Sequence, residues 1–161
     1  MSEVPPQTLA LLTRDVLDLA ALARSVEGPE HGAVVLFAGN VRDNARGNRV
    51  LYLEYEGYEP LAARQLAALV GEADRRWGVR AAAQHRLGRL EIGECSVAVA
   101  VASPHRAEAF EACRWLMDTL KETVPIWKRE HFEGGAHWVE GPHTVGTEPP
   151  PLPDYWQEPG L

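Results

Sequence analysis

Hydrophobic and polar residues follow two different periods along this chain. Three segments carry apolar residues at the spacing typical of helices: 16–26, 60–77 and 105–121. Seven shorter segments are apolar or alternate apolar with polar residues, as strands do: 7–13, 32–39, 50–56, 79–86, 95–102, 126–132 and 136–139. Because helices and strands are interspersed, and the last two strands suit a hairpin, we expect a two-layer α/β fold.

Several residues at the ends of these segments are ones that begin or end helices. Thr13 and Ser103 are expected to cap the first and third helices, and Gly78 is expected to end the second. Segment 95–102 alternates valine with alanine, so both faces are apolar, as in a strand covered on two sides. Segment 32–39 is also predicted to be a buried strand, and the residues from 87 to 94 are predicted to be a turn-rich connection.

Length and composition indicate a single domain. A chain of 161 residues with 45% hydrophobic residues fits one core, which we expect within residues 1–140. The proline-rich residues 141–161 predict a flexible or polyproline-like tail. No apolar stretch reaches the ~18 residues that cross a bilayer, and the N-terminus lacks the pattern of a signal peptide. We therefore expect a cytoplasmic protein with no membrane partner.

Charge and cysteine content exclude further classes of function. The formal net charge is −7 and no basic block interrupts it, which argues against a nucleic-acid partner. Cys95 and Cys113 form no Cys-x-x-Cys pair, so neither a zinc site nor a disulfide framework is expected. Both cysteines are expected to be small core residues. Glycine-rich nucleotide-binding motifs are also absent from the sequence.

The basic residues are divided unevenly between arginine and lysine. Of 16, 14 are arginine, and the two lysines, Lys121 and Lys128, fall in one short segment. Burial can tune a lysine amine to donate or accept a proton, whereas arginine stays charged near neutral pH. Strand alternation places Glu130 on the face of Lys128, where it could orient the amine. The two amines could thus face one pocket for an anionic substrate, although chance in an arginine-rich chain also explains the pattern.

His105 and Arg106 fall in the first turn of the third predicted helix. Backbone N–H groups at a helix N-terminus favour an anion, and two cationic side chains beside them strengthen that preference. This helix would separate His105 from Lys121 by roughly 24 Å, too far for one small ligand. If both residues act on one substrate, one of them must come from a second copy of the chain. A homodimer with a two-fold contact is therefore a testable expectation.

Five stretches carry a combination of motifs that is specific as a set. They are Gly32-Ala-Val-Val-Leu-Phe-Ala-Gly-Asn-Val-Arg42, Leu53-Glu-Tyr-Glu-Gly-Tyr58, His85-Arg-Leu-Gly-Arg-Leu-Glu-Ile-Gly-Glu94, Ser103-Pro-His-Arg-Ala-Glu-Ala-Phe110 and Leu120-Lys-Glu-Thr-Val-Pro-Ile-Trp-Lys-Arg-Glu130. In content and order these stretches resemble the MoaE family, the large, catalytic subunits of molybdopterin synthase. The resemblance covers about residues 32–140.

The resemblance implies an α/β hammerhead-type fold with a small additional antiparallel β region, which forms a homodimer. It implies a small β-grasp partner that ends in a Gly-Gly thiocarboxylate and binds at each end of the dimer, giving a heterotetramer. The implied activity is sulfur transfer from this thiocarboxylate to cyclic pyranopterin monophosphate, which forms the dithiolene of molybdopterin for the molybdenum cofactor. Because the partner carries the sulfur, Cys95 and Cys113 are not needed as persulfide carriers. No cofactor and no metal is expected in this chain.

Matching positions imply roles for individual residues. Lys121 would lie beside the thiocarboxylate carbon and Lys128 beside the reacting carbons of the substrate. Arg42 would help to hold the substrate, while His105 and Arg106 of a neighbouring copy would bind its phosphate or pterin. Three further positions match the lining of the family's pocket, and ordinary core or strand positions would explain them nearly as well: Phe37, Met117 and Glu130.

One departure from the family and two other functions stay open. Family members often carry an arginine shortly after the Trp-Val-Glu of the last strand, whereas this chain continues with Gly141-Pro142 and has no lysine or arginine beyond Arg129. The chain could instead be a persulfide transferase that uses Cys95 or Cys113, in which case the catalytic thiol would react rapidly at neutral pH. It could also be an adaptor that binds a ubiquitin-like protein without forming a product.

Overall fold

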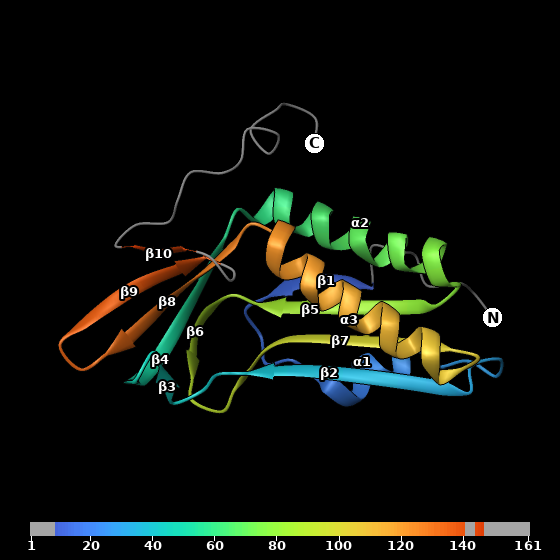
Figure 1. Cartoon of the computed structure of the whole chain (residues 1–161), viewed down its shortest axis with the longest axis horizontal. Helices are drawn as coiled ribbons and strands as arrows, with labels where there is room; N and C mark the ends of the chain where they lie inside the picture. The colour runs from blue at the N-terminus through green and yellow to red at the C-terminus, as the bar shows by residue number, and fades with distance from the viewer. Residues whose placement is uncertain (1–8, 141–143, 147–161) are drawn as a thin grey trace.

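The computed structural model describes residues 9–140 and 144–146, and Figure 1 shows how its elements are arranged. In chain order these elements are β1 (Ala10–Thr13), α1 (Leu19–Val26), β2 (Ala33–Asn40), β3 (Asn44–Ala45), β4 (Asn48–Gly57), α2 (Glu59–Trp77), β5 (Arg80–Arg86), β6 (Gly88–Glu91), β7 (Cys95–Ser103), α3 (Arg106–Thr123), β8 (Ile126–Phe132), β9 (Gly135–Glu140) and β10 (Thr144–Gly146). Within these described residues, no helix is long and apolar enough to cross a membrane.

The first sheet has four strands in the order β1-β5-β7-β2. β1 is parallel to β5, and the other pairs are antiparallel. Helices α2 and α3 pack on one face and α1 packs on the other, as Figure 1 shows. Val97, Val99 and Val101 of β7 point towards α2 and α3, while its alanines point towards α1. The prediction that this strand is covered on two sides is confirmed.

The second sheet contains six strands and is larger than the small additional β region that the sequence predicted. Its order is β10-β9-β8-β4-β3, and β6 pairs with β4 beside this path. A separate small core lies against it, formed by Val41, Val50, Leu53 and Leu90. The sheet extends to one side of the helical layer (Figure 1). The fold is thus an α/β fold with three described helices and two sheets.

Helix α2 follows the sequence signals closely. Pro60 occupies its first turn, and Gly78 ends it in the left-handed conformation with φ 62°. Glycine adopts this conformation without the steric cost that a Cβ atom imposes.

The predicted caps of the other two helices are wrong. The side chain of Asp18 caps α1 by accepting a hydrogen bond from the N–H of Ala21, whereas the Thr13 hydroxyl accepts one from Asp15 before the helix begins. Ser103 is the buried last residue of β7, and His105 occupies the N-cap position of α3 without a side-chain hydrogen bond. Both errors have one cause, because each neighbouring strand or loop extends further than the local pattern suggests.

Two further expectations about strands are corrected. β2 is not buried, because it pairs only with β7 and forms the edge of its sheet, which leaves Val34, Leu36 and Phe37 about 40% exposed. The predicted connection from 87 to 94 contains a short strand, β6, which pairs with β4. Of the predicted tail, the structure describes only β10, which pairs with β9. The rest of 141–161 lies outside the described residues.

Candidate active site

A cavity of about 260 Å³ lies where the end of the first sheet meets the second sheet. Its walls come from the end of β2 and the loop after it, from β4, β5, β7 and β8, and from the last turns of α3. Six residues singled out from the sequence line it together: Phe37, Arg42, Met117, Lys121, Lys128 and Glu130. The structure therefore brings together residues from two regions that are distant in the chain, 37–42 and 117–130.

The two lysines reach this cavity because the chain reverses between them. Lys121 lies in the last turn of α3, which ends at Thr123, and Pro125 separates the helix from the start of β8. Lys128 is 32% exposed in its side chain, and burial is the main cause that lowers its pKa below the usual lysine value. The positive charges of Lys121, Arg42 and Arg46 lower it further, while Glu130 acts in the opposite direction. Lys128 can thus release a proton more readily than a surface lysine.

Glu130 is a buried carboxylate, with 3% of its side chain exposed. One oxygen, Oε1, lies 4.0 Å from the Lys128 amine and 3.9 Å from a guanidinium nitrogen of Arg46. The other, Oε2, is buried and makes no hydrogen bond within the described part of the chain. Burial of a charged group is costly unless opposite charges compensate it, so Glu130 favours keeping cationic groups at this cavity.

Arg46 was not predicted as a site residue, and the structure explains how it reaches Glu130. It lies in the tight turn between β3 and β4, where Arg46 has φ 50° and the following Gly47 has φ 80°. Two successive positive φ angles are typical of the turns that join two-stranded hairpins. The turn directs the Arg46 side chain towards β8, since its guanidinium pairs with Glu130 of that strand.

Tyr55 and His85 also line the cavity and were not predicted. Tyr55 lies directly opposite Lys128 in the pairing of β4 with β8. Burial raises the pKa of its phenol, while a hydrogen bond with Ser96 acts the other way, and the Glu130 charge adds to the rise. The only sequence signal for Tyr55 and His85 was that they fall in the matched stretches 53–58 and 85–94.

His85 packs edge-on against Tyr55, with ring centroids 5.1 Å apart. Its Nδ1 lies 2.9 Å from the carbonyl oxygen of Arg86, an arrangement that requires the hydrogen on Nδ1. Burial lowers its pKa to about 4, with a smaller contribution from the Lys121 charge. The ring is therefore neutral near neutral pH and leaves Nε2 as an acceptor.

His105 and Arg106 are exposed at the other end of α3 and do not line the cavity. The pairing of β2 with β7 shows the separation, because Ala33 is opposite Ser103 while Asn40, at the cavity, is opposite Cys95. Within one chain the structure does not bring these two residues to the lysines.

The cavity has the chemistry of an anion-binding site that can also move protons. Three cationic side chains, Arg42, Lys121 and Lys128, line the cavity together with the buried carboxylate of Glu130. A fourth, Arg46, lies 3.9 Å from that carboxylate. Fixed cations of this kind stabilise negative charge that develops during a reaction. No group of three or more potential metal ligands was found among the described residues.

Comparisons with known proteins identify the family of this chain. The family model described as MoaE protein matches residues 12–123. The molybdopterin synthase catalytic subunit 1 of Mycobacterium tuberculosis is 45% identical over 80% of this chain and 88% of its own length, and the catalytic subunit of Bacillus subtilis is 42% identical over 80% and 82%.

Solved structures give the same result. The molybdopterin synthase structure from Staphylococcus aureus has a TM-score of 0.79 and 36% identity, and the match covers 81% of this chain and 96% of that one. A complex of subunits 1 and 2 of the molybdopterin-converting factor from Helicobacter pylori matches at 24% identity and a TM-score of 0.65, over 80% of this chain and 88% of that one, which shows a shared fold. The chain belongs to the MoaE family, the catalytic subunits of molybdopterin synthase, an enzyme of molybdenum cofactor biosynthesis.

Proposed function

We propose that this chain transfers sulfur from the C-terminal thiocarboxylate of a small β-grasp protein to cyclic pyranopterin monophosphate. The observation that carries the proposal is that Lys121 and Lys128 line one cavity together with the buried Glu130. Both reactants are anions, and the cavity offers cations to both. The product is the dithiolene of molybdopterin, formed in two rounds of transfer.

The lysines divide the chemistry between them. Lys121 lies beside the thiocarboxylate carbon of the partner's terminal glycine, while the more buried Lys128 lies beside the reacting carbons of the pterin. The thiocarboxylate sulfur attacks a pterin side-chain carbon and displaces an oxygen from it. Water then hydrolyses the bond between this sulfur and the glycine carbonyl carbon, so that the sulfur stays on the pterin and the partner leaves as a carboxylate. Lys128, with its lowered pKa, supplies the proton for the oxygen displaced from the pterin.

The other lining residues bind and orient the reactants. Arg42, at the cavity wall, holds the anionic substrate, while Phe37 and Met117 provide apolar surface for the pterin. The assembly of a small subunit with the catalytic subunit is supported by the Helicobacter pylori structure, which contains subunits 1 and 2 of the molybdopterin-converting factor.

A homodimer completes the site in this proposal. β2 is an edge strand with exposed apolar side chains, a surface suited to pairing with a second copy. In an antiparallel two-fold pairing of β2 strands, the start of one strand meets the end of the other. The N-terminus of α3, beside the start of β2, would then approach the partner's cavity and bring His105 and Arg106 to its substrate. Two small subunits on this dimer give a heterotetramer.

The persulfide alternative finds no support in the cysteines. Burial raises the pKa of Cys113 to about 11, and burial also raises that of Cys95. A catalytic thiol needs the opposite shift, because the thiolate is the reactive form. Neither cysteine is among the residues that line the cavity.

Reconstitution tests the proposed function. The purified chain, a thiocarboxylated β-grasp partner and cyclic pyranopterin monophosphate should together form the dithiolene, detected after oxidation as a fluorescent pterin derivative. The matched control is the same partner with an ordinary C-terminal carboxylate, which should bind without giving product. Complex formation without dithiolene from the thiocarboxylated partner would instead identify an adaptor.

Mixing two inactive variants tests the dimer. Hybrid dimers of Arg106→Ala and Lys121→Ala chains contain one site with both residues intact, so part of the activity should return. The two variants carry different tags, so that formation of hybrid dimers can be measured. If tagged hybrids form and activity stays absent, the site lies within a single chain.

A further inference from the structure

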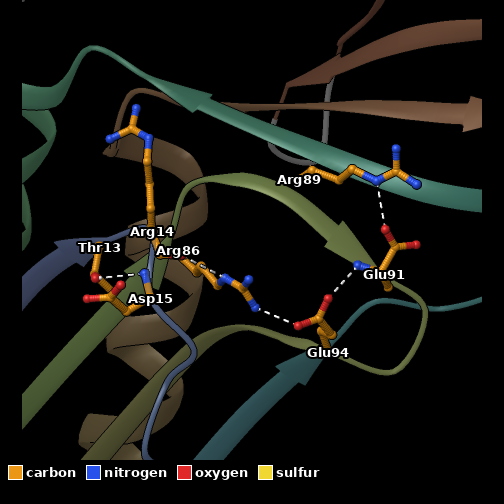
Figure 2. A network of polar contacts seen from close by, with 7 residues as sticks. All are labelled: Thr13, Arg14, Asp15, Arg86, Arg89, Glu91 and Glu94. Atoms are coloured by element: carbon orange, nitrogen blue, oxygen red, sulfur yellow. Dashed lines mark hydrogen bonds and ion pairs between the residues drawn. The ribbon is translucent and has the colours of Figure 1, made fainter.

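A polar network joins the end of β5 to the turn between β6 and β7, and Figure 2 shows its members. Arg86 of β5 forms an ion pair with Glu94, with 2.7 Å between its Nη1 and the Glu94 Oε2. The Arg86 Nε donates to the carbonyl oxygen of Arg14 at 3.3 Å. The other oxygen of Glu94 accepts a hydrogen bond from the N–H of Glu91 at 2.8 Å. Each charged group is therefore held at more than one point.

Backbone hydrogen bonds connect the turn held by this network to Val41, the residue before Arg42. The N–H of Val41 donates to the carbonyl oxygen of Glu94 at 2.9 Å, and the N–H of Gly93 donates to the carbonyl oxygen of Val41 at 2.8 Å. Val41 is itself buried in the small core beneath the second sheet. On the other side of Arg42, the carbonyl oxygen of Asp43 accepts from the N–H of Val50. The backbone of Arg42 is thus fixed between the 91–94 turn and β4.

We propose that Arg86 and Glu94 form a positioning pair that holds Arg42 in place at the wall of the cavity. The inference rests on the proposed function only in that it takes Arg42 to be a substrate-binding residue. Neither Arg86 nor Glu94 lines the cavity, so the pair acts through the 91–94 turn and through Val41. The pair also gives a physical role to the first and last charged residues of the matched stretch from 85 to 94.

A second ion pair, on β6 just before this turn, provides the comparison. Arg89 and Glu91 also lie 2.7 Å apart, but their side chains are 58% and 55% exposed, against 13% and 33% for Arg86 and Glu94. Solvent and salt weaken exposed pairs strongly. The hydrogen bond from the Glu91 backbone and the Arg86 charge lower the pKa of Glu94 below its usual value, as expected for a carboxylate held in its charged form.

The test uses two substitutions of the same type, three residues apart. Glu94→Gln keeps the shape of the side chain but removes the charge that Arg86 binds, whereas Glu91→Gln removes only the exposed pair. With Glu94→Gln we expect the KM for cyclic pyranopterin monophosphate to rise about tenfold with kcat within about twofold, because ground-state and transition-state binding weaken together. Glu91→Gln should leave both constants unchanged. Arg86→Lys, which retains a positive charge beside Glu94, should raise the KM less than Glu94→Gln does.

Hydrogen exchange reads the proposed connection directly. The amides of Val41 and Gly93, which join the turn to the end of β2, should exchange faster in Glu94→Gln than in Glu91→Gln. Equal exchange and equal KM in the two variants would overturn the proposal.

A double-mutant cycle with Arg42→Ala separates this inference from the proposed function. Once Arg42 is removed, Glu94→Gln should raise the KM no further, since the pair acts through Arg42. Additive effects of the two substitutions would overturn the positioning role. If Arg42→Ala alone leaves the KM unchanged, the substrate-binding role assigned to Arg42 fails instead.

Discussion

β7 and β8 lie in different sheets of the same molecule and are buried in opposite ways. β7 is enclosed by helices on both faces, and its buried residues are valines and alanines with a serine at each end. β8 borders the cavity and carries Lys128 and the buried Glu130. Burial of apolar groups stabilises the first region, whereas burial of charged groups in the second costs stability and changes pKa values. The difference separates two kinds of region. Substitutions in the scaffold should lower stability without altering the chemistry, whereas substitutions at the site should alter the chemistry without lowering stability.

The largest effect is expected at the site. Lys121→Ala removes an amine from the cavity without opening a hole in either core, because Lys121 is an exposed residue at the end of α3. Molybdopterin formation should fall by at least about a hundredfold, the loss expected when a group that stabilises developing negative charge is removed. The rate is measured in the reconstituted assay, and the melting temperature should stay within about 2 °C of the parent chain. A variant with near-normal turnover would contradict the role of Lys121.

The reverse result is expected in the scaffold. Leu116 is 1% exposed within the core shared by α2, α3 and the first sheet, so Leu116→Ala leaves a cavity. We expect a loss of about 3 kcal/mol in the free energy of unfolding, measured by urea denaturation, with the rate per folded molecule unchanged. Phe110→Ala is the matched control, since Phe110 lies on the same helix but is 62% exposed, and its stability should change little. A loss of activity in fully folded Leu116→Ala would contradict the separation of scaffold from site.

The scaffold was also the part that local sequence could predict. The alternation of valine and alanine in β7, Pro60 and Gly78 at the ends of α2, and the apolar stripe of α3 are local signals, and each appears where expected. The edge position of β2 was missed because an apolar strand has the same sequence pattern whether or not a further strand pairs with it. β6 was missed because four residues with charged neighbours and a single buried leucine, Leu90, look like a connection.

The site was predictable where its residues are unusual in type and not where they are common. Lysine occurs only twice in an arginine-rich chain, so its two positions are conspicuous in the sequence alone. His85 and Tyr55 sit on strands whose alternation fits ordinary core residues, and only the meeting of the two sheets places them at the cavity. Arg46 depends on a turn whose two positive φ angles could not be derived from the surrounding polar residues.

His85 should make stability depend on pH in a defined window. In the unfolded chain its pKa is near 6.5, whereas burial lowers the pKa to about 4 in the folded chain. Between these values the unfolded state binds more protons, so stability is retained above pH 6.5 and falls as the pH drops towards 4. The shift corresponds to a loss of about 3 kcal/mol across this range.

The pH window can be assigned to His85 by substitution. His85→Gln should remove most of the decrease in unfolding free energy between pH 6.5 and 4, whatever its effect on stability at neutral pH. His137→Gln, at an exposed position on β9, should leave the decrease intact. Urea denaturation at a series of pH values measures all three chains, and an unchanged slope in His85→Gln would show that other groups cause the acid sensitivity.

The smallest effect expected is a shift in the pH dependence of the reaction when Glu130 loses its charge. Glu130 raises the pKa of Lys128 against the effects of burial and of the neighbouring cations, so Glu130→Gln should lower that pKa further. If Lys128 acts as a protonated group, kcat/KM declines as the pH rises through its pKa, and this decline should move to lower pH. Glu56→Gln, which neutralises an exposed carboxylate on the neighbouring β4, should leave the profile in place. If kcat/KM instead increases with pH through this range, the neutral amine of Lys128 is the active form, and its assignment as the proton donor is wrong.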